Sequence, residues 1–473
     1  MKKVIRFSVI PALLVTVLTG CNLQPHYERP ALPVSDRWGN DGHLKEVQGT
    51  TPASETGWQT YFADEQLRQL IGLALENNRD LKVSVLNVES ARASFRVERS
   101  ALMPAISANG SQTSAHLPGN LYSTQSTGPV TYQQFEANLG VSSWEIDFFG
   151  RLRSLRDEAL EKYLSTEASS RATQISLISD VVSGYLTLCA DNDLLKLAAD
   201  TATSQRETYR LARQRYEMKV SSEQDLVQAE TSVRSAEAEL AQYERQVKQD
   251  VNALRLLVGT ELPEHLVSNA TLAHDWRFQS LPSGMPSEVL TGRPDIIAAE
   301  HTLRAANASI GAARAAFFPN ISLTASGGSA SESLGHLLEG GTAAWSFVPS
   351  ISLPIFDGGK NSANLDVAEI SRRVEIANYE KAVQTAFKEV SDALTGQSTY
   401  RHELNARVQD TVANTRYYEL ALQRYREGVD NYLNVLVAQR TLFEARKSEI
   451  SARAGELTQH VTLYKVLGGG WKA

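Results

Sequence analysis

The stretch Asp295–Ser322, DIIAAEHTLRAANASIGAARAAFFPNIS, decides the fold because the chain contains it twice. The earlier copy, Asp80–Ser107, reads DLKVSVLNVESARASFRVERSALMPAIS and lies 215 residues upstream. Residues that the two copies share include, counted in the first copy, Ala91, Ala93, Ser94, Arg99, Ala101, Pro104, Ile106 and Ser107. A period this long indicates a duplicated supersecondary unit and not a short solenoid repeat. We therefore expect two structural repeats related by approximate symmetry.

The duplication continues downstream of these copies. Gly150-Arg151 matches Gly359-Lys360, and Arg215-Tyr216 matches Arg424-Tyr425, both at a shift of 209 residues. The change of shift places the difference in length in a loop between the two anchors. Each repeat has the same order of predicted elements: a helix, two strands and a very long helical stretch.

The long stretches predict helical hairpins. Residues 151–258 contain one glycine and no proline, and residues 360–467 contain no proline. Apolar residues recur every seven positions, which predicts a coiled-coil seam; they are Leu226, Val233, Leu240, Val247 and Leu254, then Leu436, Phe443, Ile450, Leu457 and Tyr464. Short turns interrupt both stretches, at 217–222 and 427–431. Ser222 and Asp430 suit helix N-caps there, and Gly428 suits a helix end.

Alternating segments predict strands. Residues 321–326 alternate strictly, as do 345–347, 351–353 and 135–142, and residues 105–115 form a weaker fourth case. Segments of about ten residues match tilted membrane strands, and the connections 117–131 and 328–344 are long and polar. The alternative is a soluble sandwich with one wet face. Four strands cannot close a membrane barrel, whereas three chains would supply twelve.

The N-terminal residues predict export and anchoring in the outer membrane. A basic start and a short apolar run end in Leu18-Thr19-Gly20-Cys21, which resembles a lipobox after a secretory signal. Cleavage would leave Cys21 as a lipidated N-terminus, and the following residue is Asn22, whereas an aspartate there usually retains lipoproteins at the inner membrane. The alternative is that Cys21 is a structural thiol.

Composition excludes several other classes. A net charge of −7 argues against nucleic acid as a partner, and two cysteines exclude a disulfide framework. The chain shows no catalytic elbow, P-loop or histidine/cysteine cluster, so we expect neither an enzyme nor a bound cofactor or metal. Cys189 lies in an apolar helical stripe and is expected to be a small buried hydrophobe.

An ordered set of short motifs carries a family resemblance. They are Cys21, residues 144–151 (WEIDFFGR), 293–296 (RPDI), 318–319 (FP), 354–359 (PIFDGG), 424–425 (RY), 428–430 (GVD) and 467–471 (LGGGW). With them the chain resembles the TolC-like outer-membrane factors, in the OprM-type (NodT-type) lipoprotein branch. The resemblance implies a mixed α/β membrane protein, a homotrimer with a twelve-stranded β-barrel, four strands per chain, and a long α-helical periplasmic barrel. Its segments would be a signal peptide (1–20), a lipidated extended segment (21–65), a first repeat (66–259), an equatorial connection (260–292) and a second repeat (293–473).

The resemblance also implies the function. Such a protein is a passive export duct for drugs or other small toxic compounds in the Gram-negative outer membrane. Its tunnel docks onto a periplasmic adaptor and an inner-membrane pump of the proton-driven RND type. Two alternatives stay open: a metal-ion efflux channel of the same family, although the chain past residue 21 has only three methionines, and a lipid-anchored coiled-coil scaffold without a pore.

The family closes its tunnel at the periplasmic helix tips. Members often carry an acid in a Leu-Asp-Ala-Gln segment, which here reads Leu436-Val437-Ala438-Gln439, so Leu433 and Val437 predict a gate weighted towards apolar closure. The alternative for Val437 is packing within the seam. Asp225 and Asp430 could add a ring of carboxylates, or serve only as caps or solvated surface. The candidate adaptor contacts, which could also be plain turns, are Lys219, Val220, Ser221, Ser222, Gly428, Val429, Asp430, Asn431 and Tyr432.

Overall fold

The computed structural model describes the whole chain except residues 1–21, 36–55, 119–127, 269, 280–286 and 470–473. Cys21 therefore lies outside the described residues, and its lipidation stays a prediction. The chain divides into two compact units, which are treated separately below. Unit 1 comprises Met1–Ala31, Asn87–Thr166 and Ala298–Tyr379, and unit 2 comprises Leu32–Leu86, Glu167–Ile297 and Glu380–Ala473.

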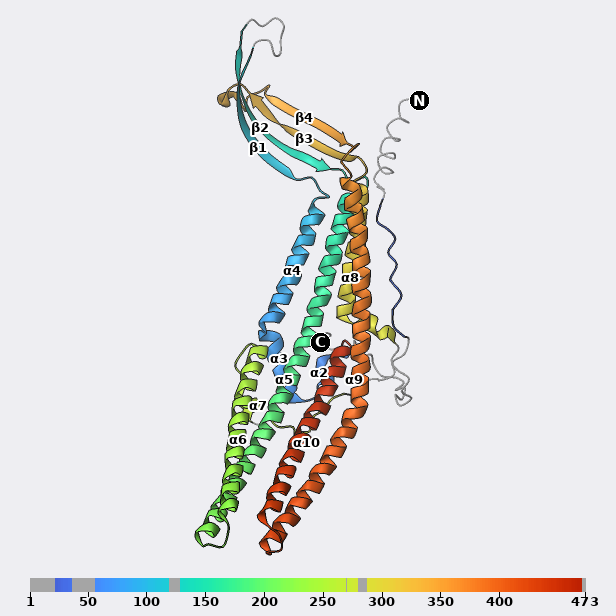
Figure 1. Cartoon of the computed structure of the whole chain (residues 1–473). Coiled ribbons are helices and arrows are strands. Elements are labelled where there is room, and N and C mark those ends of the chain that lie inside the picture. The colour runs from blue at the N-terminus through green and yellow to red at the C-terminus, as the bar shows by residue number, and fades with distance from the viewer. Residues whose placement is uncertain (1–21, 36–55, 119–127, 269, 280–286, 470–473) are drawn as a thin grey trace. The chain divides into compact units, whose positions relative to one another are not determined.

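The elements follow the duplicated order that the sequence predicts (Figure 1). The first half contains α2 (Trp58–Tyr61), α3 (Glu65–Asn77), α4 (Arg79–Ser100), β1 (Ile106–Leu117), β2 (Val130–Glu145), α5 (Arg151–Glu217), α6 (Glu223–Val258) and α7 (Glu264–Ser268). The second half contains η2 (Ser287–Gly292), α8 (Pro294–Ala315), β3 (Asn320–Ser331), η3 (Leu334–His336), β4 (Ala343–Ser352), α9 (Lys360–Arg426) and α10 (Tyr432–Val466). Helix, two strands, long helix and returning helix thus occur twice, and the predicted duplication is confirmed.

Equivalent residues of the two repeats make equivalent contacts in unit 2. The side-chain amide of Asn78, just before α4, donates to the carbonyl of Leu257 at 2.8 Å. Arg293, the residue in the same place before α8, donates to the carbonyl of Val466 at 2.7 Å. Each closing contact ties the start of a short helix to the last turn of the hairpin of its own repeat. The symmetry therefore extends from the element order to single hydrogen bonds.

In the described part of unit 1, four strands form one antiparallel sheet in the order β1-β2-β3-β4. Successive residues of a strand point to opposite faces of the sheet, and the pairing register aligns the predicted alternations. One face gathers apolar residues from all four strands: Ile106, Ala108, Phe135, Ala137, Leu139, Val141, Ile321, Leu323, Ala325, Trp345, Phe347 and Ile351. The other gathers polar ones, including Asn109, Asn138, Ser326 and Ser346.

The apolar face is not a soluble core. Trp345 is 81% exposed, Ile351 70% and Leu139 61%. A contiguous exposed apolar surface of this kind is typical of a protein or membrane contact. Large apolar groups facing outward and polar groups on the opposite face match the pattern of outer-membrane strands. A soluble sandwich would need a second sheet to cover this face, and the described residues form only the one sheet.

The weakest alternating segment, 105–115, is confirmed as strand β1. Strand β3 differs from the prediction, because it continues to Ser331 and so includes Gly328, which was expected to begin the connection 328–344. Gly328 is required there because β2 and β3 approach closely: a Cβ built on it would overlap the carbonyl oxygen of Ala137 and lie 2.5 Å from the Cα of Asn138. Glycine here marks a close backbone approach and not a turn.

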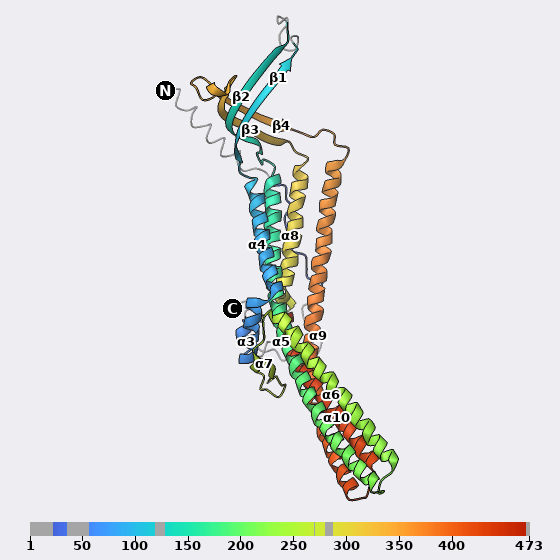
Figure 2. The same cartoon turned by 90° about the vertical axis from the view of Figure 1, so that its left-hand side faces the viewer.

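The predicted helical hairpins are present in unit 2. Figures 1 and 2 show α5 with α6, and α9 with α10, as antiparallel pairs that each end in a short turn. The predicted seam is buried or half-buried throughout: Val233 and Leu254 of α6, and Phe443, Leu457 and Tyr464 of α10, are buried, and the other five residues are half-buried. Cys189 of α5 is fully buried, as expected. Among the described residues, no helix combines the length and the apolarity that a membrane crossing requires.

An aromatic cluster closes the middle of unit 2. Tyr61 stacks on Tyr464 of α10 with ring centroids 4.4 Å apart, and Phe62 meets the same ring edge-on at 5.1 Å. Phe62 also forms an isolated antiparallel bridge with Phe278. The segments before α3 and after α7 are therefore joined to each other and to the last helix.

Candidate functional site at the helix tips

The turn between α5 and α6 forms the first tip. The amide of Val220 donates to the carbonyl of Arg215 at 2.9 Å, and Lys219 adopts a left-handed backbone with φ of 59°. Ser222 caps α6 as predicted, because its side chain accepts from the amide of Asp225 at 3.1 Å while Asp225 accepts from the amide of Ser222 at 3.3 Å. This reciprocal capping box satisfies two amides that the helix start leaves without partners.

The turn between α9 and α10 repeats this geometry. The amide of Val429 donates to the carbonyl of Arg424 at 2.9 Å, and Gly428 is left-handed with φ of 78°. Gly428 corresponds to Lys219 in the duplication, so one conformation is made by glycine in one tip and by lysine in the other. For a residue with a Cβ that conformation costs about 1–2 kcal/mol.

One predicted cap is wrong. The N-cap of α10 is Asn431, whose side chain accepts from the amide of Asn434, and it is not Asp430. Asp430 instead binds Arg424, with the guanidinium Nε 2.6 Å from a carboxylate oxygen. This hydrogen bond from Arg424 holds the pKa of Asp430 below its usual range. The carboxylate of Asp430 is therefore engaged with Arg424 across the turn, and the next residue, Asn431, caps the helix.

The two tips pack against each other within unit 2. Arg215 of α5 lies over the ring of Tyr425 of α9, 5.4 Å from its centroid, and also bonds its hydroxyl. Ala229, Tyr432 and Val435 form a buried cluster between α6 and α10. Tyr432 is only 8% exposed, and burial raises its pKa to about 12. Its side chain therefore stabilises the tip from inside and does not face a partner.

The predicted gate residues lie off the most buried face of α10. Val435, Ala438 and Leu442 fill the packed face of α10. Leu433 and Val437, one turn apart, stay 49% and 36% exposed. Both line a cavity of about 730 Å³ between α5, α6 and α10. Leu436 and Phe443 of the predicted seam line the same cavity, so the gate and the seam packing both stay predictions for Val437.

The remaining predicted tip residues divide into two groups. Val220 and Val429 are 62% and 60% exposed, and Met218 of the first tip is 66% exposed, so both tips carry apolar side chains free to contact a partner. Asp225 is engaged locally: hydrogen bonds with the Ser222 side chain and then with Ser221 hold its pKa below its usual range. The capping role of Asp225, one of its alternatives, is what the contacts show.

Residues 70–260 and 285–469 both match the family model described as outer membrane efflux protein. The chain belongs to that family. The toluene efflux pump outer membrane protein TtgC of Pseudomonas putida is 46% identical over 461 residues, which cover 97% of this chain and 95% of TtgC. The antibiotic efflux pump outer membrane protein ArpC of Pseudomonas putida shows the same identity and coverage.

A solved structure of an outer membrane channel has the same fold. The open state of the MtrE outer membrane channel of Neisseria gonorrhoeae superposes with a TM-score of 0.85 at 37% identity, and the match covers 96% of this chain and 99% of that one. This outer membrane efflux protein is therefore a TolC-like channel component, located in the outer membrane, and not an enzyme. The predicted fold class, location and passive channel function are confirmed, and the scaffold without a pore is excluded.

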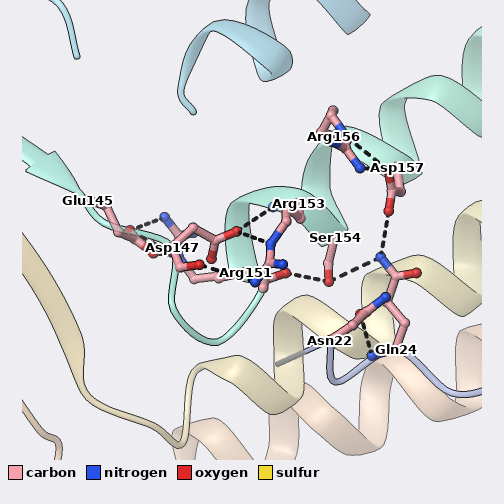
Figure 3. Close-up of polar contacts among 10 residues, drawn as sticks. Asn22, Gln24, Glu145, Asp147, Arg151, Arg153, Ser154, Arg156 and Asp157 are labelled. Atoms are coloured by element: carbon pink, nitrogen blue, oxygen red, sulfur yellow. Dashed lines mark hydrogen bonds and ion pairs between the residues drawn. The ribbon is translucent and has the colours of Figure 1, made fainter. Parts of the chain in front are cut away.

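The efflux protein also contains a polar site in unit 1 that the sequence did not reveal (Figure 3). Gln24, close behind Cys21, donates to Ser154 at 3.3 Å and to Asp157 at 3.0 Å on α5. Gly311 of α8 leaves the room for it, since a Cβ there would lie 2.5 Å from the Gln24 side chain. We call residues 22–31 the N-terminal strap. Nothing in the composition of the strap distinguishes these contacts from those of a loose linker.

Just before α5, a strand-to-helix junction in Figure 3 explains one family motif. Arg151 binds Glu145 through two nitrogens, at 2.6 and 2.9 Å, and Arg153 binds Asp147 at 3.1 Å. Gly150 makes the turn with φ of 77°. Residues 144–151 are therefore a rigid connection from β2 to α5, in which paired charges fix the helix start.

Proposed function

We propose that three copies of this chain form the outer-membrane duct of a tripartite pump that exports small, largely apolar toxic compounds. The observation that carries the proposal is the sheet of unit 1, with an exposed apolar face and two unpaired edge strands, β1 and β4. An open edge in lipid leaves backbone groups without partners at several kcal/mol each. Closure with two further copies pairs every edge and gives twelve strands.

The test is assembly and conduction by the purified protein. We expect a trimer mass in detergent and a single-channel conductance in planar bilayers. A monomer that conducts nothing in the bilayer would contradict the proposal. The substrate class is supported by the names of two relatives at equal identity, one a toluene and one an antibiotic efflux protein. Loss of organic-solvent and antibiotic tolerance on gene deletion would check that class.

The partners we propose are a periplasmic adaptor and a proton-driven inner-membrane pump of the RND type. The exposed Val220 and Val429 support contact at the tips, because exposed apolar side chains on a turn gain from burial against a partner. Photo-cross-linkers placed at these two residues should capture an adaptor in cells. Tyr432, which is buried, is the matched position from which no adaptor should be captured.

The gate gives a prediction of its own. We propose that Leu433 and Val437 narrow the closed duct and exclude ions by an apolar constriction. Leu433→Ser should then raise the closed-state conductance several-fold, because a hydroxyl keeps the constriction wet. Single-channel recordings measure this. Val429→Ser removes a more exposed apolar group from the same tip, outside the cavity, and should leave the conductance unchanged. Equal leak in both variants would overturn the gate assignment.

A further inference from the structure

The polar face of the sheet carries very little charge. The four strands contain no lysine or arginine, and their only carboxylates are Glu136 and Glu145, both in β2. Glu145 lies at the strand end, where Arg151 neutralises it at 2.6 Å. Among the described strand residues, Glu136 is the one carboxylate without an ion-pair partner. The face that carries it otherwise presents uncharged side chains, which are hydroxyls, amides and glycines with a few apolar residues such as Ala330 and Val348.

Glu136 is also held in place. Its carboxylate accepts a hydrogen bond from the Asn138 side chain at 2.6 Å, and Asn138 in turn accepts from Asn109 of β1 at 3.4 Å. The residues paired with Glu136 on either side are Ser111 and Ala330, and neither carries charge. A relay of two amides therefore fixes a full negative charge in an uncharged surrounding, in the middle of the polar face.

From this geometry we propose that Glu136 determines charge selectivity in the barrel section of the duct. The inference rests on the trimeric channel proposed above, in which the apolar face meets lipid and the polar face lines the water-filled lumen. Symmetry then repeats the charge three times at one level of the lumen. Three carboxylates favour cationic and zwitterionic compounds over anions. They are a filter separate from the apolar constriction at the tips.

The strength of this filter depends on salt. Charges are screened over about 8 Å at 0.15 M ionic strength but over about 30 Å at 0.01 M. The electrostatic potential of the carboxylates therefore extends across the lumen of a wide barrel only in dilute salt. The selectivity should be weak in physiological salt and grow on dilution, which distinguishes fixed charge from a narrow pore.

The experiment is the reversal potential of single channels in a KCl gradient at low salt. We expect the wild type to prefer potassium, and Glu136→Gln to lower the cation-to-anion permeability ratio by about two-fold or more at ~0.01 M salt. Glu136→Asp keeps the charge and should keep the preference. Glu332→Gln, in the exposed β3–β4 connection, is the matched control and should change it little.

A second variant guards against loss of folding. Ser111→Lys places a cation directly opposite Glu136 across the β1–β2 pair, and it should cancel the preference while the carboxylate stays. Conducting Glu136→Gln or Ser111→Lys channels with the wild-type reversal potential would overturn the inference. A wild-type protein that forms no channel would instead overturn the proposed trimeric duct.

Discussion

Gly328→Val should abolish formation of the folded channel. The new Cβ would overlap the backbone of β2, at the carbonyl of Ala137, and backbone cannot move aside as a flexible side chain can. Strands β2 and β3 join the two repeats within the sheet, so their separation would divide the sheet into two hairpins. We expect a cost above about 4 kcal/mol, beyond the range of ordinary substitutions.

The neighbouring glycine supplies a matched control. Gly327 lies on the opposite, apolar face of the same strand, and a Cβ there would have nothing within 4 Å. Gly327→Val should therefore fold and even favour the strand through β-branching. The measurement is the yield of detergent-stable trimer from outer membranes. Similar yields of the two variants would show that close approach of β2 and β3 is not required.

Glu300→Ala should loosen the N-terminal strap. Glu300 of α8 is 6% exposed and binds Arg29 of the strap at 2.7 Å and Arg304 at 2.6 Å. Burial alone would raise its pKa, but the hydrogen bonds from Arg29 and Arg304 keep the pKa below its usual range. The alanine variant loses these charge-assisted bonds, worth roughly 3 kcal/mol in total since both arginines can still reach water.

Amide hydrogen exchange over residues 22–31 measures the effect directly. We expect faster exchange across the strap in Glu300→Ala, together with a lower thermal midpoint in detergent. Glu158→Gln removes the partner of the exposed Lys162, an ion pair of 2.6 Å on α5, and should change neither quantity because such pairs contribute little. If strap exchange in Glu300→Ala equals that of Glu158→Gln, the strap is held by other contacts.

Because Glu300 ionises more easily in the folded state, the same contact is sensitive to acid. A lowered pKa contributes stability above the unfolded value of about 4.3, and this stability is lost as pH falls through the folded value. The strap should therefore loosen in strong acid in the wild type.

The periodic parts of this fold were predictable from sequence. The duplication, the heptads of α6 and α10 and the alternation of β3 and β4 are repeated patterns, and repetition makes each signal redundant. Cap identity and strand length were harder. Asn431 and Asp430 are both good caps in isolation, and only the ion pair of Asp430 with Arg424 decides between them. Gly327-Gly328 resembles a loop unless the approach of the adjacent strand is known.

The site was predictable in part. The turns at the tips followed from the breaks in the two helical stretches, whereas the gate role of Leu433 and Val437 comes from the family resemblance and stays a prediction. The burial of Tyr432 did not, because it depends on a neighbouring hairpin that is far away in sequence. The contacts of the strap were missed for the same reason: Gln24, Arg29 and Glu300 carry no local periodicity, and their partners lie more than a hundred residues away.

The two closing contacts of the repeats differ in chemistry although they are equivalent in position. Asn78 holds the first hairpin with a neutral side-chain amide, which does not ionise. Arg293 holds the second with a guanidinium that also binds Asp295 and Glu389, at 2.6 and 2.8 Å. Since Glu389 belongs to α9 and Val466 to α10, the guanidinium joins the start of α8 to both helices of its hairpin. Gene duplication has thus left one hairpin, the one that carries Leu433 and Val437, with an ionic anchor, while the other hairpin is anchored by a neutral hydrogen bond.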